Sequence, residues 1–335
     1  MPSFRPTPAA ARPVALLSLA LLAIGASPAG AQFTAYDGFA SPGSYRADGG
    51  YADPVAGPSN ALLFDAPPAD GTNVGQGPAV TGFSGAWASS SAFSSSVYPR
   101  VEQSQLTYTD GNGGSLLTSS GQINLFRSVG DGGSGNKSFN RSLSLANSLP
   151  VSLYMSVLVR FNAGVSSLGI DWLSNSADGL NPRPFKLEMD AAGALTFSGF
   201  STAGTYTSQQ GALTADTTHL LVFKLTDSDL NTSHTTSGDS MRVFIDPVLS
   251  TEGSNTPITY GDTNTTFYVS ANALWSLRDL KLSANVAGGG SVIFDEVRIG
   301  STWSSVTTTV PEPTTAGLLL LGLAAAGGLR RQRSA

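Results

Sequence analysis

The feature that most constrains the fold is a succession of short apolar runs separated by turn-forming residues. One run, YMSVLVRF at 154–161, alternates with a period of two, which places on one face Met155, Val157, Val159 and Phe161. That period is typical of a half-buried strand. Clusters of Gly, Asp, Asn and Ser, such as DGNGG at 110–114, punctuate the runs. Frequent short runs between turn signals predict strands and an all-β fold.

Further runs fit strands along most of the chain. Before residue 150 they are NALLF (60–64), SQLTY (104–108), GSLLT (114–118) and QINLF (122–126). After it they are FKLEM (185–189), ALTFSGF (194–200), HLLVFKL (219–225), MRVFI (241–245), TFYVS (266–270), LRDLKLSA (277–284) and VIFDEVRIG (292–300). HLLVFKL is apolar in both phases, which predicts a central strand. Only SANALWSLRD (270–279) favours a short helix. The pattern predicts a two-sheet antiparallel β-sandwich or jelly roll.

The N-terminus has the layout of a secretory signal. Arg5 and Arg12 precede an apolar stretch at 14–24, and small residues follow at Ala29 and Ala31. A basic flank, an apolar segment and an A-x-A site together predict cleavage after Ala31 and export of the protein.

The C-terminus carries a rigid segment, an apolar run and a basic cluster in that order. The apolar run, residues 316–329, would reach only about 21 Å as a helix, against roughly 30 Å of hydrocarbon. Pro311 and Pro313 keep the preceding segment extended. The run is followed by Arg330, Arg331 and Arg333. Positive charge beside a membrane segment stays cytoplasmic, so the body would lie outside. A single-pass anchor is the alternative.

This order resembles a known bacterial signal. Val310-Pro311-Glu312-Pro313, a Gly/Leu/Ala helix and then Arg330-Arg331 are similar to the PEP-CTERM sorting signal of Gram-negative bacteria. The resemblance implies recognition by an exosortase in the inner membrane, where the C-terminal segment holds the protein transiently. It further implies a destination at the cell surface or in the exopolysaccharide matrix. The predicted division is a signal peptide at 1–31, one large domain at 32–306, and linker with sorting signal at 307–335.

Composition excludes several functions. Between residues 32 and 310 there are 13 basic and 22 acidic residues, a net charge of −9. Such an acidic body lacks the basic surface that nucleic acids require. The chain has no cysteine, which excludes thiol catalysis and cysteine-ligated metals.

The predicted domain resembles a second family. The segments AYDGFASPGSY (35–45), GFSGAWAS (82–89), THLLVFKL (218–225), DSMRVFIDPVL (239–249) and VIFDEVRIGSTWSSV (292–306) look like laminin-G or concanavalin-A-like domains of bacterial exported proteins with the same tail. The resemblance implies a two-sheet jelly roll, a fold often used for glycan binding, although fold alone does not fix function.

The carboxylates favour a non-enzymatic protein. Glycosidases on this fold use two acidic side chains across a cleft. In KLEMDAAG, Glu188 and Asp190 share a strand face, but Ala192 occupies the next position in phase, so no catalytic residue is predicted. In VIFDEVRIG, Asp295 shares a phase with three apolar residues, Ile293, Val297 and Ile299. A buried Asp295 would tether a loop through backbone donors, or contact calcium or a ligand.

Two sets of residues are candidates for binding. Oxygen ligands that suit calcium are offered by Asp110, Asp131, Asp227, Asp229 and Asp295, with ordinary turns as the alternative; no other cofactor is expected. Aromatic rings that could pack on sugars are Trp87, Trp172 and Tyr206, with core packing as the alternative.

The sequence therefore predicts a non-enzymatic exported surface or matrix protein with weak binding to extracellular polysaccharide. One alternative is a secreted polysaccharide hydrolase or lyase on the same fold. Another is a structural or adhesive protein without a glycan ligand.

Processing can be tested by mass spectrometry of the exported protein. We expect a mature chain that begins at Gln32 and lacks the segment after Pro313, because both ends are predicted to be removed. An intact C-terminus on mature surface protein would contradict processing.

Overall fold

The computed structural model describes residues 35–39, 61–62, 82–89, 98–102, 104–119, 121–127, 129, 134–143, 152–174, 185–201, 204–226, 240–260 and 277–308. The chain divides between Gln32 and Phe33 into two compact units, and all described residues belong to the second. The predicted signal helix, the C-terminal apolar helix and the predicted strand 266–270 lie outside the described residues.

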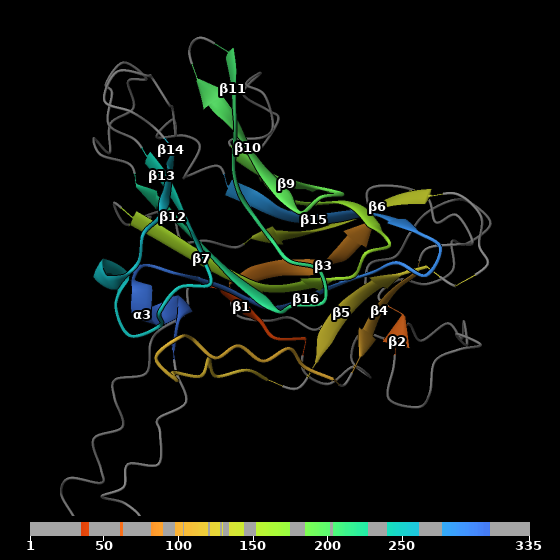
Figure 1. The fold of residues 1–335 in the computed structure, drawn as a ribbon, viewed down its shortest axis with the longest axis horizontal. Helices are drawn as coiled ribbons and strands as arrows, with labels where there is room; N and C mark the ends of the chain where they lie inside the picture. Colours follow the sequence, from red (N-terminus) through yellow and green to blue (C-terminus); the bar gives the residue numbers. More distant parts are fainter. Residues whose placement is uncertain are drawn as a thin grey trace, which may run out of the picture. The chain divides into compact units, whose positions relative to one another are not determined.

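The described residues form two antiparallel sheets (Figure 1). The larger sheet has the strand order β14 (Ile258–Tyr260), β13 (Ser240–Ile245), β12 (His219–Thr226), β7 (Ser152–Phe161), β16 (Ser291–Gly300), β5 (Gln122–Phe126), β4 (Tyr98–Glu102) and β2 (Ala61–Leu62), with β1 (Ala35–Asp37) also paired to β16. The smaller sheet has the order β11 (Gly204–Ala212), β10 (Ala194–Ser201), β9 (Phe185–Asp190), β8 (Val165–Ser174), β15 (Leu277–Ala287), β6 (Ser134–Leu143) and β3 (Phe83–Ser89). Two short helices, η3 (Glu252–Ser254) and α3 (Trp303–Val306), complete the described elements. The prediction of a two-sheet antiparallel sandwich is confirmed.

One apolar core fills the space between the sheets. The predicted face of β7 contributes Met155, Val157 and Val159, and the facing sheet contributes Leu280 and Leu282 of β15. Core rings also meet across the sandwich, since Phe139 of β6 and Phe294 of β16 pack edge to face with centroids 6.2 Å apart. Alternation along the central strands of both sheets therefore sends side chains into one shared core.

A second apolar cluster covers the outer face of the larger sheet. The opposite phases of β7 and β12, including Leu158 and Val222, pack there against Trp303 of α3. Residues 104–119, which we call the covering loop, add Leu106, Tyr108 and Leu116. The loop is drawn in gold in Figure 1, below β1 and β5. Strand β12 is thus buried on both faces, as predicted for a central strand.

Two predictions of secondary structure are wrong, one in the covering loop and one at the start of β15. SQLTY and GSLLT are not strands. Leu106, Tyr108 and Leu116 pack on the sheet, and the two segments are joined by the isolated bridge Thr109–Ser115 and by a bond from Leu116 N to Tyr108 O at 2.9 Å. The predicted helix at 270–279 is also incorrect in its last three residues, which begin β15; the others lie outside the described residues. Helix α3 was not predicted, although Thr302 and Ser305 form a capping box there.

The predicted phase of β16 is wrong beyond Asp295, because a β-bulge interrupts the strand. Pairing with β7 shifts by one residue between Asp295 and Arg298, and Glu296 takes a positive φ of 54°. The extra residue reverses the phase, so Phe294, Val297 and Ile299 all lie in the inter-sheet core. At the same point β16 exchanges its neighbour β5 for β1.

A buried ion pair joins the two sheets. Asp37 of β1 bonds the guanidinium of Arg141 of β6, and both side chains are fully buried. The same carboxylate accepts a hydrogen bond from Trp87 Nε1 at 3.0 Å and one from the backbone of Phe39 at 3.0 Å. These additional bonds offset part of the cost of removing the charges from water.

Removing one partner of this pair should be strongly destabilising. Asp37→Ala leaves the Arg141 charge buried without its carboxylate, and we expect it to lower the free energy of unfolding by about 3–5 kcal/mol in urea denaturation. Asp279→Ala, at a partly exposed carboxylate of β15, is the control and should change it by less than about 0.5 kcal/mol. Equal effects of the two changes would contradict a structural role for the pair.

Candidate functional site

A polar hollow of about 370 Å³ lies on the outer face of the smaller sheet. Its polar lining comes from four adjacent strands: Asn136 and Ser138 of β6, Ser167, Gly169 and Asp171 of β8, Lys186 and Glu188 of β9, and Lys281 and Ser283 of β15. The alternate residues of these strands, such as Ile170, Leu187 and Leu282, face the core. The hollow is therefore the solvent side of a sheet whose other side is apolar.

A glycine forms part of the floor of the hollow. Gly169 lies in register with Glu188 on one side and Ser283 on the other. A Cβ atom at this position would come within 2.6 Å of Ser283 Oγ. The absence of a side chain thus keeps space open between three strands that otherwise carry polar groups.

The charges that line the hollow form two pairs. Lys186 bonds Glu188 two positions along the same strand, and Lys281 Nζ lies 3.8 Å from Asp171 Oδ2 on the neighbouring strand. Glu188 is half exposed, whereas Asp171 is buried. Two ammonium groups facing two carboxylates leave the site with many donors and acceptors but no formal net charge.

These groups suit a hydroxyl-rich ligand better than a metal ion. Hydroxyl, amide, ammonium and carboxylate groups together can both donate and accept hydrogen bonds. Within the described part of the chain, no group of three His, Cys, Asp or Glu side chains could hold a metal.

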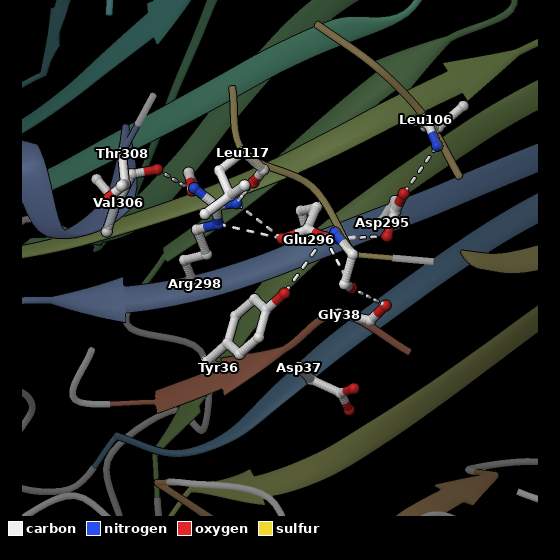
Figure 2. A network of polar contacts seen from close by, with 12 residues as sticks. Tyr36, Asp37, Gly38, Leu106, Leu117, Asp295, Glu296, Arg298, Val306 and Thr308 are labelled. Atoms are coloured by element: carbon white, nitrogen blue, oxygen red, sulfur yellow. Dashed lines mark hydrogen bonds and ion pairs between the residues drawn. The ribbon is translucent and has the colours of Figure 1, made fainter. Parts of the chain in front are cut away.

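A second polar site, which we call the bulge network, surrounds Glu296 (Figure 2). The Glu296 carboxylate accepts hydrogen bonds from Tyr36 Oη at 3.3 Å and from Ser119 Oγ at 2.9 Å, as well as from the Ser119 backbone. It also accepts bonds from Arg298 Nε at 3.2 Å and from a terminal guanidinium nitrogen at 2.9 Å. One buried carboxylate thereby connects β1, the covering loop and β16.

The bulge network continues to the last described residues. Arg298 donates to the carbonyl oxygen of Leu117, whose own N–H donates to Thr308 O at 3.0 Å. Ser156 Oγ of β7 donates to Val306 O at 2.9 Å. Residues 301–308, which we call the exit segment, are therefore fixed to both the covering loop and the sheet (Figure 2).

Asp295 tethers the covering loop, which confirms the prediction that a buried Asp295 would bond backbone donors of a loop. Its two oxygens accept bonds from Leu106 N and Glu296 N, each at 2.8 Å. Burial, followed by the charge of Glu296, raises the pKa of Asp295 to about 9, although the two backbone donors act in the opposite direction. Burial therefore favours the protonated form of Asp295 in the folded protein.

Among the calcium candidates, Asp110 organises a turn, which was the alternative to calcium binding at this position. It accepts backbone bonds from Asn112 at 2.9 Å, Gly114 at 2.8 Å and Leu249 at 2.7 Å. Burial opposes ionisation, but these donors outweigh it and lower the pKa of Asp110. Three candidates lie outside the described residues: Asp131, Asp227 and Asp229.

The aromatic candidates give a different result. Glycan contact by Trp87 is wrong, because the ring is fully buried, packs edge to face on Phe139 at 5.0 Å and bonds Asp37. Trp172 and Tyr206 lie on β8 and β11, but their side chains are outside the described part of the structure, so those two predictions stay predictions.

Sequence reasoning identified Glu188 and Asp190 as sharing a strand face, but it missed most of the hollow. Asp190 accepts bonds from Ala192 and Ala194, both at 2.9 Å, in the turn that follows β9, as predicted. The missed residues are polar side chains that alternate with apolar ones along their strands, and the sequence shows this alternation. What the sequence did not show is that β6, β15, β8 and β9 are neighbours.

Comparison with known families identifies the C-terminal segment. Residues 309–333 match the PEP-CTERM protein-sorting motif, directly after the exit segment. The match confirms the resemblance seen in the sequence and implies an exported protein of a Gram-negative-type bacterium that is sorted by an exosortase. No curated protein matches the sequence. In the part of the chain that the structure describes, no helix is long and apolar enough to cross a membrane.

Several solved structures are similar at low identity. A glycosyl hydrolase family 16 protein from Mycobacterium smegmatis shares 13% identity over 80% of this chain and 100% of its own, with a TM-score of 0.36. The carbohydrate-binding module CBM66 from Bacillus subtilis shares 11% identity over 58% of this chain and 91% of the module, with a TM-score of 0.30. The globular domain of T. cruzi calreticulin shares 11% identity over 73% of this chain and 95% of that domain, with a TM-score of 0.37. Likeness at this level does not bear on activity.

The raised pKa of Asp295 predicts an unusual pH dependence. Between about pH 4 and 9 the folded state keeps a proton that an unfolded aspartate loses, so the free energy of unfolding falls as pH rises through this window. Asp295→Asn removes the titration. Relative to wild type, the variant should gain up to about 1.4 kcal/mol for each pH unit in urea unfolding measured between pH 5 and 8. Asp279→Asn is the control, and a constant difference between Asp295→Asn and wild type would contradict the assignment.

Proposed function

We propose that this protein is a non-enzymatic exported protein of the cell surface or exopolysaccharide matrix, and that the hollow on the smaller sheet binds an extracellular polysaccharide. The observation that carries the proposal is the hollow itself, a polar depression built from four strands whose other faces pack in the apolar core.

The sorting motif supports the proposed destination. Residues 309–333 would hold the precursor in the inner membrane until an exosortase-type enzyme removes the tail. The released domain would then act outside the cell, where polysaccharide is the abundant polymer. An acidic body without cysteine suits this setting, because its fold depends on burial and not on disulfides.

The chemistry of the hollow favours a polyhydroxylated ligand. Sugar hydroxyls are both donors and acceptors, and they can bond in turn to Ser283, Asn136 and the charged pairs. Each bond replaces one to water, so single contacts contribute little and binding would be weak unless many sugar units engage. A repetitive polysaccharide presented to many copies of the domain provides that multivalency.

Hydrolysis is a second candidate function, favoured by one observation. Asp171 and Glu188 come from neighbouring strands, and both carboxylates line the hollow. Each already has a lysine partner, Lys281 and Lys186 respectively. We therefore propose binding as the main function and treat hydrolysis as the alternative to be measured.

Binding can be tested with residues 32–308 on a glycan array that includes the producer's own exopolysaccharide, with and without calcium. Gly169→Val fills the floor of the hollow and should weaken binding at least about tenfold, as should Lys186→Met, which removes a charged donor. The matched control is Asp279→Asn on the same sheet, which should bind as wild type does. Unchanged thermal unfolding checks that each variant is folded.

Two outcomes would contradict the proposal. If no glycan on the array is bound, polysaccharide binding is excluded, whereas the sorting prediction is unaffected. Release of reducing ends from a bound polysaccharide, lowered about 10²-fold or more by Glu188→Gln, would show that the protein is a hydrolase.

A further inference from the structure

The tail leaves the folded domain at a fixed point. The exit segment is held by Thr308 to the covering loop, by Val306 to β7, and by Trp303 Nε1 to Leu249 O at 2.9 Å. Thr307 Oγ1 adds bonds to the carbonyl oxygens of Trp303 at 3.0 Å and Leu249 at 3.2 Å. The sorting motif begins at the next residue, 309, so no long linker separates it from the fold.

The distance from this point to the membrane is limited by the chain. Seven residues lie between Thr308 and Ala316, where the apolar run starts, and the eight Cα–Cα steps from Thr308 to Ala316 span at most about 28 Å at full extension. A compact domain of about 275 residues is roughly 50 Å across. When the apolar run is in the bilayer, the face that carries the exit segment must therefore lie near the lipid, and the opposite face cannot.

The surface around the exit point has unusual composition for this acidic protein. The covering loop and the exit segment together contain one charged residue, Asp110, which is 7% exposed and bonded to backbone N–H groups. Their exposed residues are Ser, Thr, Gln, Asn and Gly, together with Leu117, which is 47% exposed beside Thr308. Such a surface can approach a lipid headgroup layer without repulsion from anionic lipids, and Leu117 can enter it.

The hollow lies on the other side of the sandwich. The covering loop packs on the outer face of the larger sheet, whereas the hollow opens from the outer face of the smaller one. The two candidate surfaces are thus separated by both sheets and the core between them.

We propose that the covering loop and the exit segment form the membrane-proximal face of the exported precursor, in contact with the lipid surface, so that the hollow faces away from the membrane. This inference rests on the proposed retention of the tail in the inner membrane. It adds an orientation: the polysaccharide site of the precursor is accessible before the tail is removed. Lipid is the partner because the short tether itself brings the bilayer to this face.

Fluorescent labelling of the full chain tests the orientation. The chain has no cysteine, so single variants can be labelled uniquely. Asn112→Cys places a donor on the exposed turn of the covering loop, and Ser142→Cys places one on the outer face of the smaller sheet. Each protein is reconstituted into phosphatidylethanolamine/phosphatidylglycerol vesicles with an acceptor on the lipid headgroup. Energy transfer should be at least about twofold more efficient from position 112 than from position 142.

The outcomes separate the inference from its premise. Failure of the full chain to co-sediment with vesicles would contradict membrane retention and, with it, the orientation. Co-sedimentation with equal transfer from both positions, or more from position 142, would overturn the orientation alone. A preference that appears only in membranes containing the processing enzyme would replace lipid with protein as the partner. Leu117→Asp should reduce transfer from position 112 without changing unfolding, and no reduction would exclude lipid contact by Leu117.

Discussion

The bulge at Glu296 is the constraint on which the rest of the larger sheet depends. A non-glycine residue with positive φ costs roughly 1–3 kcal/mol and persists only where its surroundings fix it. Here Glu296 is fixed by Arg298, Tyr36 and Ser119, from three different segments. Because the bulge also reverses the phase of β16, it allows one strand to keep apolar residues in the core while it changes partner from β5 to β1. The bonds of the bulge network and the packing of β16 thus support each other.

The bulge network also determines how the two ends of the domain are held. Tyr36 belongs to the first described strand, and the Arg298–Leu117–Thr308 connection reaches the last described residue. The buried pair of Asp37 and Arg141 then joins β1 to the smaller sheet. In consequence both ends are integral to the fold. The sorting motif begins directly after a segment that is hydrogen-bonded to the fold, and that attachment gives the proposed membrane orientation its physical basis.

The two outer faces of the sandwich differ in polarity because only one of them is covered. The outer face of the larger sheet is apolar and buried beneath the covering loop and α3. The outer face of the smaller sheet stays open over four strands and carries alternating polar side chains, with Gly169 leaving space among them. A solvated polar sheet face on a rigid core is a suitable surface for weak, repeated contacts with a polymer.

The sequence by itself determined the strand content, the central position of β12 and the sorting motif, because each depends on residues close together in the chain. Period-two alternation shows which residues share a face, and the order of Pro-Glu-Pro, apolar run and arginines is local. Only the tertiary structure decided the phase of β16 after Asp295, the burial of Trp87 and the packing of SQLTY and GSLLT as a covering loop. It also decided the hollow, whose residues lie on strands from β6 to β15. These features arise from contacts between segments far apart in sequence, and local periodicity contains no information about which strands become neighbours.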